Sequence, residues 1–170
     1  PEAQLLLAST GAYGFIASVE GMSSRQRAGK TFVSLNAGES ICRPSPLTIF
    51  QAKSEDSGVK PASEAMNSVV TTSPSNAENY AAVAASHVAC VSVSGRLLSF
   101  ELSELKTLDK GGRGLLLIDL DKKDSLAGAC AYTRSIKITG VGRGGKGREE
   151  TLEIRSLNNA KGSRAKKGKE

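Results

Sequence analysis

Tryptophan, histidine and long apolar runs are scarce or absent in this chain of 170 residues. It has no Trp, aromatic residues make up 4% of it, and His87 is its single histidine. Proteins that hold single-stranded nucleic acid stack the bases on aromatic side chains, so single-strand binding is not expected. No apolar run approaches the roughly 18–20 residues of a transmembrane helix, so we expect no membrane partner.

Cysteine and histidine do not form the patterns of a disulfide or metal protein. Cys42, Cys90 and Cys130 are odd in number and widely spaced. These spacings exclude a disulfide framework and a CxxC zinc site, and one histidine leaves no His/Cys metal cluster. Reduced cysteines fit a cytoplasmic compartment. The chain starts at Pro1 without Met or a signal peptide, so we expect it to be a piece of a longer protein.

Positive charge is in excess and lies mostly near the end of the chain. Lys and Arg number 23 against 17 Asp and Glu, a net charge of +6. Residues 155–170 hold six cationic side chains and one Glu, which is +5 of that total. A solvated, disordered terminus is one interpretation of this segment. The other is that part of it belongs to a repeated unit.

Short strand-like runs separated by glycine turns predict an all-β fold. Such runs occur at 5–9, 13–17, 31–35, 88–92, 97–100 and 115–120, whereas only 102–108 has helical spacing. Residues 51–79 differ, being rich in Ser, Thr, Asn, Glu and Pro, and predict an irregular surface insertion in which 62–70 could form a short helix. We expect one domain made of repeated β units, which we call blades. A blade lies at 1–50, the insertion at 51–79, a second blade at 80–125 and a last blade at 126–170.

An internal repeat supports this division. When Arg27-Ala28-Gly29-Lys30 is aligned with Lys110-Gly111-Gly112-Arg113, the strand-like runs that follow them also match without a gap, and Lys166-Lys167-Gly168-Lys169 is a third copy. The repeated feature is basic-x-Gly-basic, in which glycine permits a tight turn that holds cations at its tip. If three units of roughly 55 residues pack around an axis, the tips lie on one cationic rim. Such a rim suits duplex DNA, which carries one negative charge per roughly 1.7 Å.

The repeated residues resemble a known family. Gly14-Phe15 with the run 25–31, and the run 94–100 with Lys110 to Gly114, are similar to blades of the C-terminal domains of type IIA DNA topoisomerases. The gyrase A subunit carries a QRRGGKG box in this place, and the degenerate form at 27–30 favours the topoisomerase IV A subunit over gyrase. The run 143–147 is literally closer to that box but follows Gly112 too soon for a full blade, so we interpret it as a basic hairpin turn.

The resemblance implies a partial β-pinwheel, a propeller-like all-β fold whose neighbouring blades exchange strands. It implies sequence-independent duplex DNA binding and bending that positions DNA for strand passage, for relaxation or decatenation. The catalysis would lie elsewhere in a longer protein, which uses ATP and Mg²⁺, pairs with an ATPase B subunit and a second A subunit, and associates with the nucleoid. No cofactor, metal site or catalytic residue is expected in this chain, and Tyr13, Tyr80 and Tyr132 lack the context of the tyrosine that cleaves DNA.

The expected DNA contacts are the cations of the repeated tips, the basic hairpin and the end of the chain. They are Arg25, Arg27, Lys30, Lys110, Arg113, Arg143, Lys146, Arg164, Lys166, Lys167 and Lys169.

Two other functions stay open at this stage. A P-loop-like nucleotide hydrolase is suggested by Gly29-Lys30-Thr31 and by 140–147, but Ser24 replaces the first glycine of one and Gly147 replaces the hydroxyl of the other. A protein-interaction propeller would use the insertion as its contact. His87 among apolar neighbours predicts a structural histidine, and the acidic residues between 119 and 124 predict a loop of balanced charge rather than a calcium site.

Overall fold

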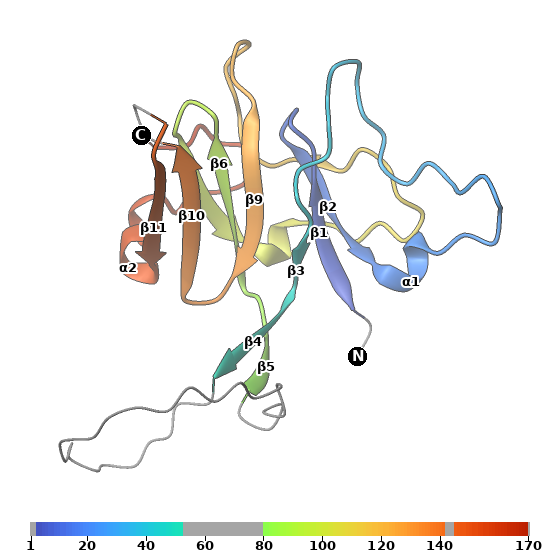
Figure 1. The fold of residues 1–170 in the computed structure, drawn as a ribbon, viewed down its shortest axis with the longest axis horizontal. Helices are drawn as coiled ribbons and strands as arrows, with labels where there is room; N and C mark the ends of the chain where they lie inside the picture. The colour runs from blue at the N-terminus through green and yellow to red at the C-terminus, as the bar shows by residue number, and fades with distance from the viewer. Residues whose placement is uncertain (1–2, 53–79, 142–144, 170) are drawn as a thin grey trace.

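The computed structural model describes residues 3–52, 80–141 and 145–169, and its strands far outnumber its helices (Figure 1). The prediction of an all-β fold is confirmed. The elements in chain order are β1 (Gln4–Ala8), β2 (Tyr13–Ser18), α1 (Val19–Met22), β3 (Ser45–Pro46), β4 (Thr48–Ala52), β5 (Tyr80–Ala84), β6 (His87–Ser92), β7 (Leu97–Glu101), the 3-10 helix η2 (Leu102–Glu104), β8 (Leu115–Leu116), β9 (Leu126–Tyr132), β10 (Ser135–Val141), β11 (Gly147–Glu153) and α2 (Ile154–Asn159).

A β-hairpin followed directly by a short helix occurs three times along the chain. The hairpins β1–β2, β6–β7 and β10–β11 begin and end at the pairs Gln4↔Ser18, His87↔Glu101 and Ser135↔Glu153. Each second strand leads directly into α1, η2 or α2. At the first of these junctions, the Ser18 hydroxyl caps the helix by accepting a hydrogen bond from the Gly21 amide at 3.0 Å. One hairpin lies in each predicted blade.

The first two sheets are each extended by a segment of the unit that follows. The first sheet has the order β3-β1-β2-β8, in which β8 comes from the second unit. In the second sheet, β9 pairs with β6, and the outer edge of β7 bonds to residues 160–169 of the third unit. The segment at 155–170 is therefore not a free tail in its described part, to residue 169: it forms most of α2 and then the outermost chain of the second sheet. The interpretation as a disordered terminus is wrong.

The core lies between these sheets. The largest cluster joins Leu6 and Ile16 of the first sheet to Val88 and Phe100 of the second. A second cluster packs Leu157 of α2 and Ile136 of β10 against the second sheet. A third covers the other face of the first sheet, where Phe15 lies under Phe32 with ring centroids 6.0 Å apart.

Strands β4 and β5 form a two-stranded arm (Figure 1), and β4 includes Gln51 and Ala52, which the sequence had placed in the irregular insertion. They pair in antiparallel fashion from Thr48↔Ala84 to Ala52↔Tyr80, so the chain enters and leaves residues 53–79 through one two-stranded ladder. The predicted short helix at 62–70 lies outside the described residues. Within those that are described, no helix has the length and apolar character needed to cross a membrane.

Candidate nucleic-acid interface

We call residues 25–31, 109–114 and 163–168 the first, second and third basic segments. In the second segment, Gly111 and Gly114 adopt φ values of +76° and +82°, which glycine accepts without strain. A Cβ at Gly111 would overlap the Phe32 carbonyl, and one at Gly114 would overlap the Gly14 carbonyl. The two glycines thus allow the turn to lie directly on the backbone of the first unit.

The third segment has the same framework as the second. Just before the second segment, the Leu108 amide donates a hydrogen bond to Ile16 O at 2.8 Å. Just before the third segment, the Gly162 amide donates an equivalent bond to Ser99 O, also at 2.8 Å. Ala165 takes the place of Gly111 with a φ of +61°. Gly168 takes the place of Gly114 and closely approaches the backbone of Leu97.

The predicted alignment of the third segment is therefore wrong by two positions. Lys110 corresponds to Arg164, rather than to Lys166, when main-chain hydrogen bonds define the alignment, and Arg113 corresponds to Lys167. Lys169 does not lie at a turn tip, because its amide and carbonyl both bond to Leu97 in a strand ladder, at 2.9 and 2.8 Å.

Arg164 is turned into the protein rather than toward solvent. Its Nη1 donates to Leu116 O at 2.7 Å, and its amide donates to Glu104 Oε2 at 2.9 Å. The side chain is half-buried, so its guanidinium holds the third segment on β8. Lys166 and Lys167 are the exposed cations of this segment.

The first segment makes a separate turn, closed by a hydrogen bond of 2.9 Å from Gly29 N to Gln26 O. Arg25, Arg27 and Lys30 are all exposed. The Lys30 ammonium donates to Gly21 O at 2.5 Å and lies 5.2 Å from the centroid of the Phe32 ring. Lys30 is thus anchored beside α1, and the two arginines project into solvent.

Main-chain hydrogen bonds connect the three segments in series. Gly112 of the second segment receives a bond from Ser34 N at 3.0 Å and gives one to Phe32 O at 2.9 Å, just beyond the first segment. The third segment repeats this contact with the chain beyond the second, since Ala165 N donates to Leu117 O at 2.9 Å and Lys166 O accepts from Asp119 N at 3.1 Å. At both boundaries, the basic segment of one unit is therefore bonded to the chain that follows the basic segment of the unit before it.

The described part of the run 143–147 occupies a different place, since residues 145 and 146 directly precede β11, the second strand of the β10–β11 hairpin. Lys146 is exposed there, whereas Arg143 lies outside the described residues. The same position in the earlier hairpins is the tight turn after β1 and the turn after β6. The run is thus a lengthened hairpin turn rather than the basic segment of the last unit, as its early place in the sequence indicates.

Two acidic residues contact the cations, Glu39, which the sequence did not single out, and Asp121, which it placed in a loop of balanced charge. Glu39 Oε1 lies 3.8 Å from Arg113 Nη2, and Asp121 Oδ1 lies 3.3 Å from Lys167 Nζ. The Arg113 guanidinium also stacks on the Tyr13 ring, 4.0 Å from its centroid. The signal was present in the sequence, because each acid follows the strand that comes after a basic segment.

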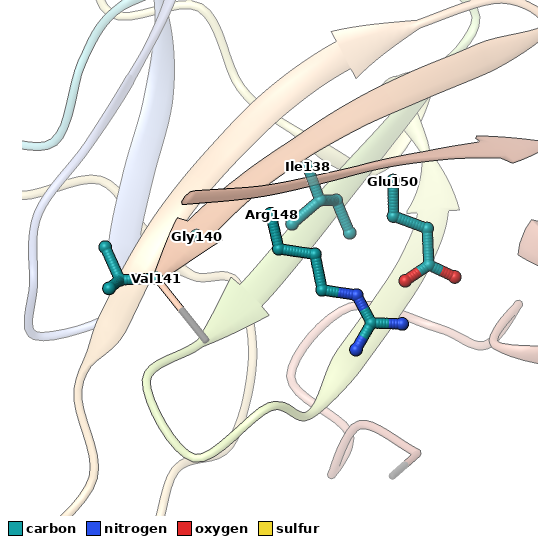
Figure 2. Close-up of a pocket in the computed structure, with 5 residues that line it drawn as sticks. All are labelled: Ile138, Gly140, Val141, Arg148 and Glu150. Carbon is teal, nitrogen blue, oxygen red and sulfur yellow. The ribbon is translucent and has the colours of Figure 1, made fainter. Parts of the chain in front are cut away.

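A surface pocket of about 260 Å³ lies on the β10–β11 hairpin (Figure 2). Its lining residues are Ile138, Gly140, Val141, Arg148 and Glu150. Arg148 and Glu150 extend from the same face of β11 (Figure 2). Among the described residues, those that line the pocket include no histidine, cysteine or hydroxyl side chain.

The remaining candidate sites have structural roles. The His87 ring lies 5.5 Å from that of Tyr132, and its Nδ1 is 2.8 Å from the neighbouring Ser86 hydroxyl, so it is placed as a strand histidine. The Ser94 hydroxyl donates to Asp124 at 2.6 Å and lowers the pKa of that carboxyl from 3.8 to about 2. The described residues bring together no metal-binding group of His, Cys, Asp or Glu.

The P-loop alternative fails on geometry. A P-loop connects a buried strand to a helix whose N-terminus holds the phosphates. Residues 24–31 instead follow the short helix α1 and lead to a single bridge at Val33. Gly147 begins the strand β11, so the second glycine-rich run is part of a hairpin.

Comparisons with known proteins agree with this geometry. The A subunit of DNA topoisomerase 4 from Neisseria gonorrhoeae is 29% identical over 170 residues, which are 99% of this chain and 18% of the relative. No protein-family model matches the sequence.

Solved structures share the fold over 99% of this chain. The E. coli ParC C-terminal domain has a TM-score of 0.68 at 22% identity, with 55% of that chain covered. The C-terminal domain of DNA topoisomerase IV has a TM-score of 0.63 at 11% identity and 41% coverage, and that of DNA gyrase A has 0.62 at 14% and 43%. The predicted resemblance is confirmed: the chain has the fold of the C-terminal domains of topoisomerase IV and gyrase A, and along almost its whole length its sequence is similar to that of the topoisomerase IV A subunit.

Proposed function

We propose that the chain binds duplex DNA without sequence preference, through phosphate contacts made by its basic segments. The single observation that carries the proposal is the common framework of the second and third segments. It leaves Lys110 and Arg113 exposed in one turn, and Lys166 and Lys167 exposed in the other. The first segment adds Arg25, Arg27 and Lys30, which are exposed in a turn just before Phe32.

Recognition of bases has little support in these elements. Helices that read the major groove need several turns, whereas α1 and α2 have four and six residues. Phosphate contacts fix a duplex in place without reading its sequence. Because the segments are joined in series across successive units, a bound duplex would follow them along a curve, and we propose that the chain bends DNA.

The chain spans about a fifth of its curated relative, so the role of the whole protein is a wider proposal. We propose that this domain positions DNA for strand passage catalysed elsewhere in a topoisomerase A subunit. That protein would act with a second copy of itself and an ATPase B subunit, use ATP and Mg²⁺, and associate with the nucleoid in the cytoplasm. The described residues of this chain would contribute DNA binding and no catalytic group.

A salt titration tests the proposal. The binding constant for a long random-sequence duplex is measured by fluorescence anisotropy at several salt concentrations, for the wild type and for Lys110→Gln with Arg113→Gln. Log K should fall steeply with log salt in the wild type. The double variant should flatten that slope by up to about 0.9 for each phosphate that is no longer bound, or at most about 1.8 in all.

The matched control is Arg134→Gln with Lys137→Gln, which removes the same charge from exposed residues at the base of the β10–β11 hairpin. It should leave the slope near that of the wild type. Equal flattening in both variants would mean that only total charge matters, and flattening in the control alone would place the DNA on the hairpin.

A further inference from the structure

The acids beside Arg113 and Lys167 form a repeated arrangement rather than two separate ion pairs. Arg113 and Lys167 occupy the same position of the second and third basic segments. Each contacts a carboxylate from the loop of the preceding unit, Glu39 in one case and Asp121 in the other.

The two loops that carry the acids are equivalent in the fold. The Thr10 amide donates to Ser40 O at 2.9 Å at the end of the first loop. The Val93 amide donates to Ser125 O, also at 2.9 Å, at the end of the second. Thr10 and Val93 follow the first strands of their hairpins, so both loops return to the same point of a unit. At each of the two boundaries between units, a carboxylate thus contacts the cation at the same position of the basic segment.

Both acids are held in position by other groups. The Glu39 carboxylate accepts hydrogen bonds from the Asn36 amide at 3.1 Å and from Asn36 Nδ2 at 2.9 Å, and its side chain is only 15% exposed. Asp121 also lies 3.0 Å from Arg96 Nη1, in the turn between β6 and β7. By contrast, Arg113 and Lys167 are 41% and 61% exposed, so they remain accessible to a second anion.

We propose that Glu39 and Asp121 are intramolecular counterions that compete with DNA phosphates for Arg113 and Lys167, and so lower the affinity of the basic segments and its dependence on salt. This inference rests on the proposed DNA-binding function. When Arg113 leaves Glu39 for a phosphate, the freed carboxylate attracts a cation from solution. That uptake cancels part of the cation release from DNA that drives binding. Removal of the acid should therefore make the salt dependence steeper.

The experiment compares Glu39→Gln and Asp121→Asn with Glu149→Gln in the same duplex titration. The Glu149→Gln control removes one negative charge and one exposed ion pair, that with Lys137 at 2.6 Å on the β10–β11 hairpin. We expect Glu39→Gln and Asp121→Asn each to bind roughly two- to five-fold more tightly at low salt, the range expected for release of an exposed ion pair. Each slope should become steeper by up to about 0.9. Thermal melts check that the three variants are folded.

Repeating the Asp121→Asn substitution in the Lys167→Gln variant tests whether the gain in DNA affinity depends on the Lys167–Asp121 pair. In Lys167→Gln, the additional change Asp121→Asn should alter the affinity less than it does in the wild type, because the competing cation is gone. Equal gains in Asp121→Asn and Glu149→Gln, or an undiminished gain in Lys167→Gln, would overturn the inference while leaving DNA binding intact. A wild-type chain that does not bind duplex DNA would instead refute the proposed function.

Discussion

At the scale of single residues, Gly114 separates two reasons for which a position requires glycine. Gly114 and Gly38 have nearly the same φ, +82° and +83°. A Cβ at Gly114 would overlap the Gly14 carbonyl, whereas none of the described atoms lies within 4 Å of a Cβ at Gly38. Position 38 therefore favours glycine only because of its left-handed backbone. Position 114 favours glycine for the same reason and also because a Cβ has no room beside the Gly14 carbonyl.

We expect Gly38→Ala to lower the free energy of unfolding by about 1 kcal/mol, the cost of left-handed backbone in a residue with a side chain. Gly114→Ala should cost at least about 3 kcal/mol, because the strand β8 must also move away from β2. Urea denaturation of both variants measures the difference. Equal losses would mean that the contact between the second segment and Gly14 is looser than the structure has it.

The candidate site was predictable from sequence only where the repeat has no insertions. Lys30 and Arg113 were aligned because the basic segments and following strands of the first two units match without a gap. The third unit was misaligned for two physical reasons. Its helix α2 has six residues where η2 of the second unit has three, and Lys166 stands at the position of Gly112, the glycine of the motif. A search for basic-x-Gly-basic therefore moved too far along the chain, to 166–169.

At the scale of elements, α2 fixes the third unit to the second sheet through one side chain. Leu157 is fully buried and packs with Ala89, Tyr132 and Ile136. Ile154 lies in the same helix and is 39% exposed. The helix is too short to be stable alone, so its position depends on this contact.

We expect Leu157→Ala to lower the free energy of unfolding by about 2–5 kcal/mol, the usual cost of a large cavity in a core. Ile154→Ala should cost less than half as much, since it removes a partly exposed side chain from the same helix. Chemical denaturation gives both values. Similar values for the two variants would show that α2 is held by its polar contacts.

The strands of the first two hairpins were predictable, whereas β9 and the strands of the last hairpin were not. Strands β1, β2, β6 and β7 are compact runs of buried apolar residues. In β11 six of the seven residues are exposed, and β9 consists largely of Ala and Gly, so neither carries a strong strand pattern. The predicted strand at 31–35 is reduced to the bridge Val33↔Gly112, because it pairs with a turn rather than with another strand.

At the scale of the whole molecule, the last residues are a structural part of the second unit. Four main-chain hydrogen bonds join residues 160–169 to Leu97 and Ser99 of β7. Net contributions of about 0.5–1.5 kcal/mol per bond make this ladder worth roughly 2–6 kcal/mol. Removing the chain end would leave β7 with an open edge.

Deletion of residues 160–170 should therefore lower the urea midpoint of unfolding, whereas Lys166→Gln with Lys167→Gln and Lys169→Gln should leave it nearly unchanged. The substitutions remove exposed cations but keep the backbone that pairs with β7. If the deletion and the substitutions change the midpoint equally little, the segment behaves as a tail after all.

Strand exchange between units also determines when each sheet can be completed during synthesis. The outer partner of β2 is β8, which emerges from the ribosome about 100 residues later, or roughly 5–20 s at the usual rate of elongation. The partner of β7 follows sooner, because no insertion intervenes between β7 and the end of the chain. The first sheet therefore waits longest with an unpaired edge in the nascent chain, and residues 53–79 extend that wait.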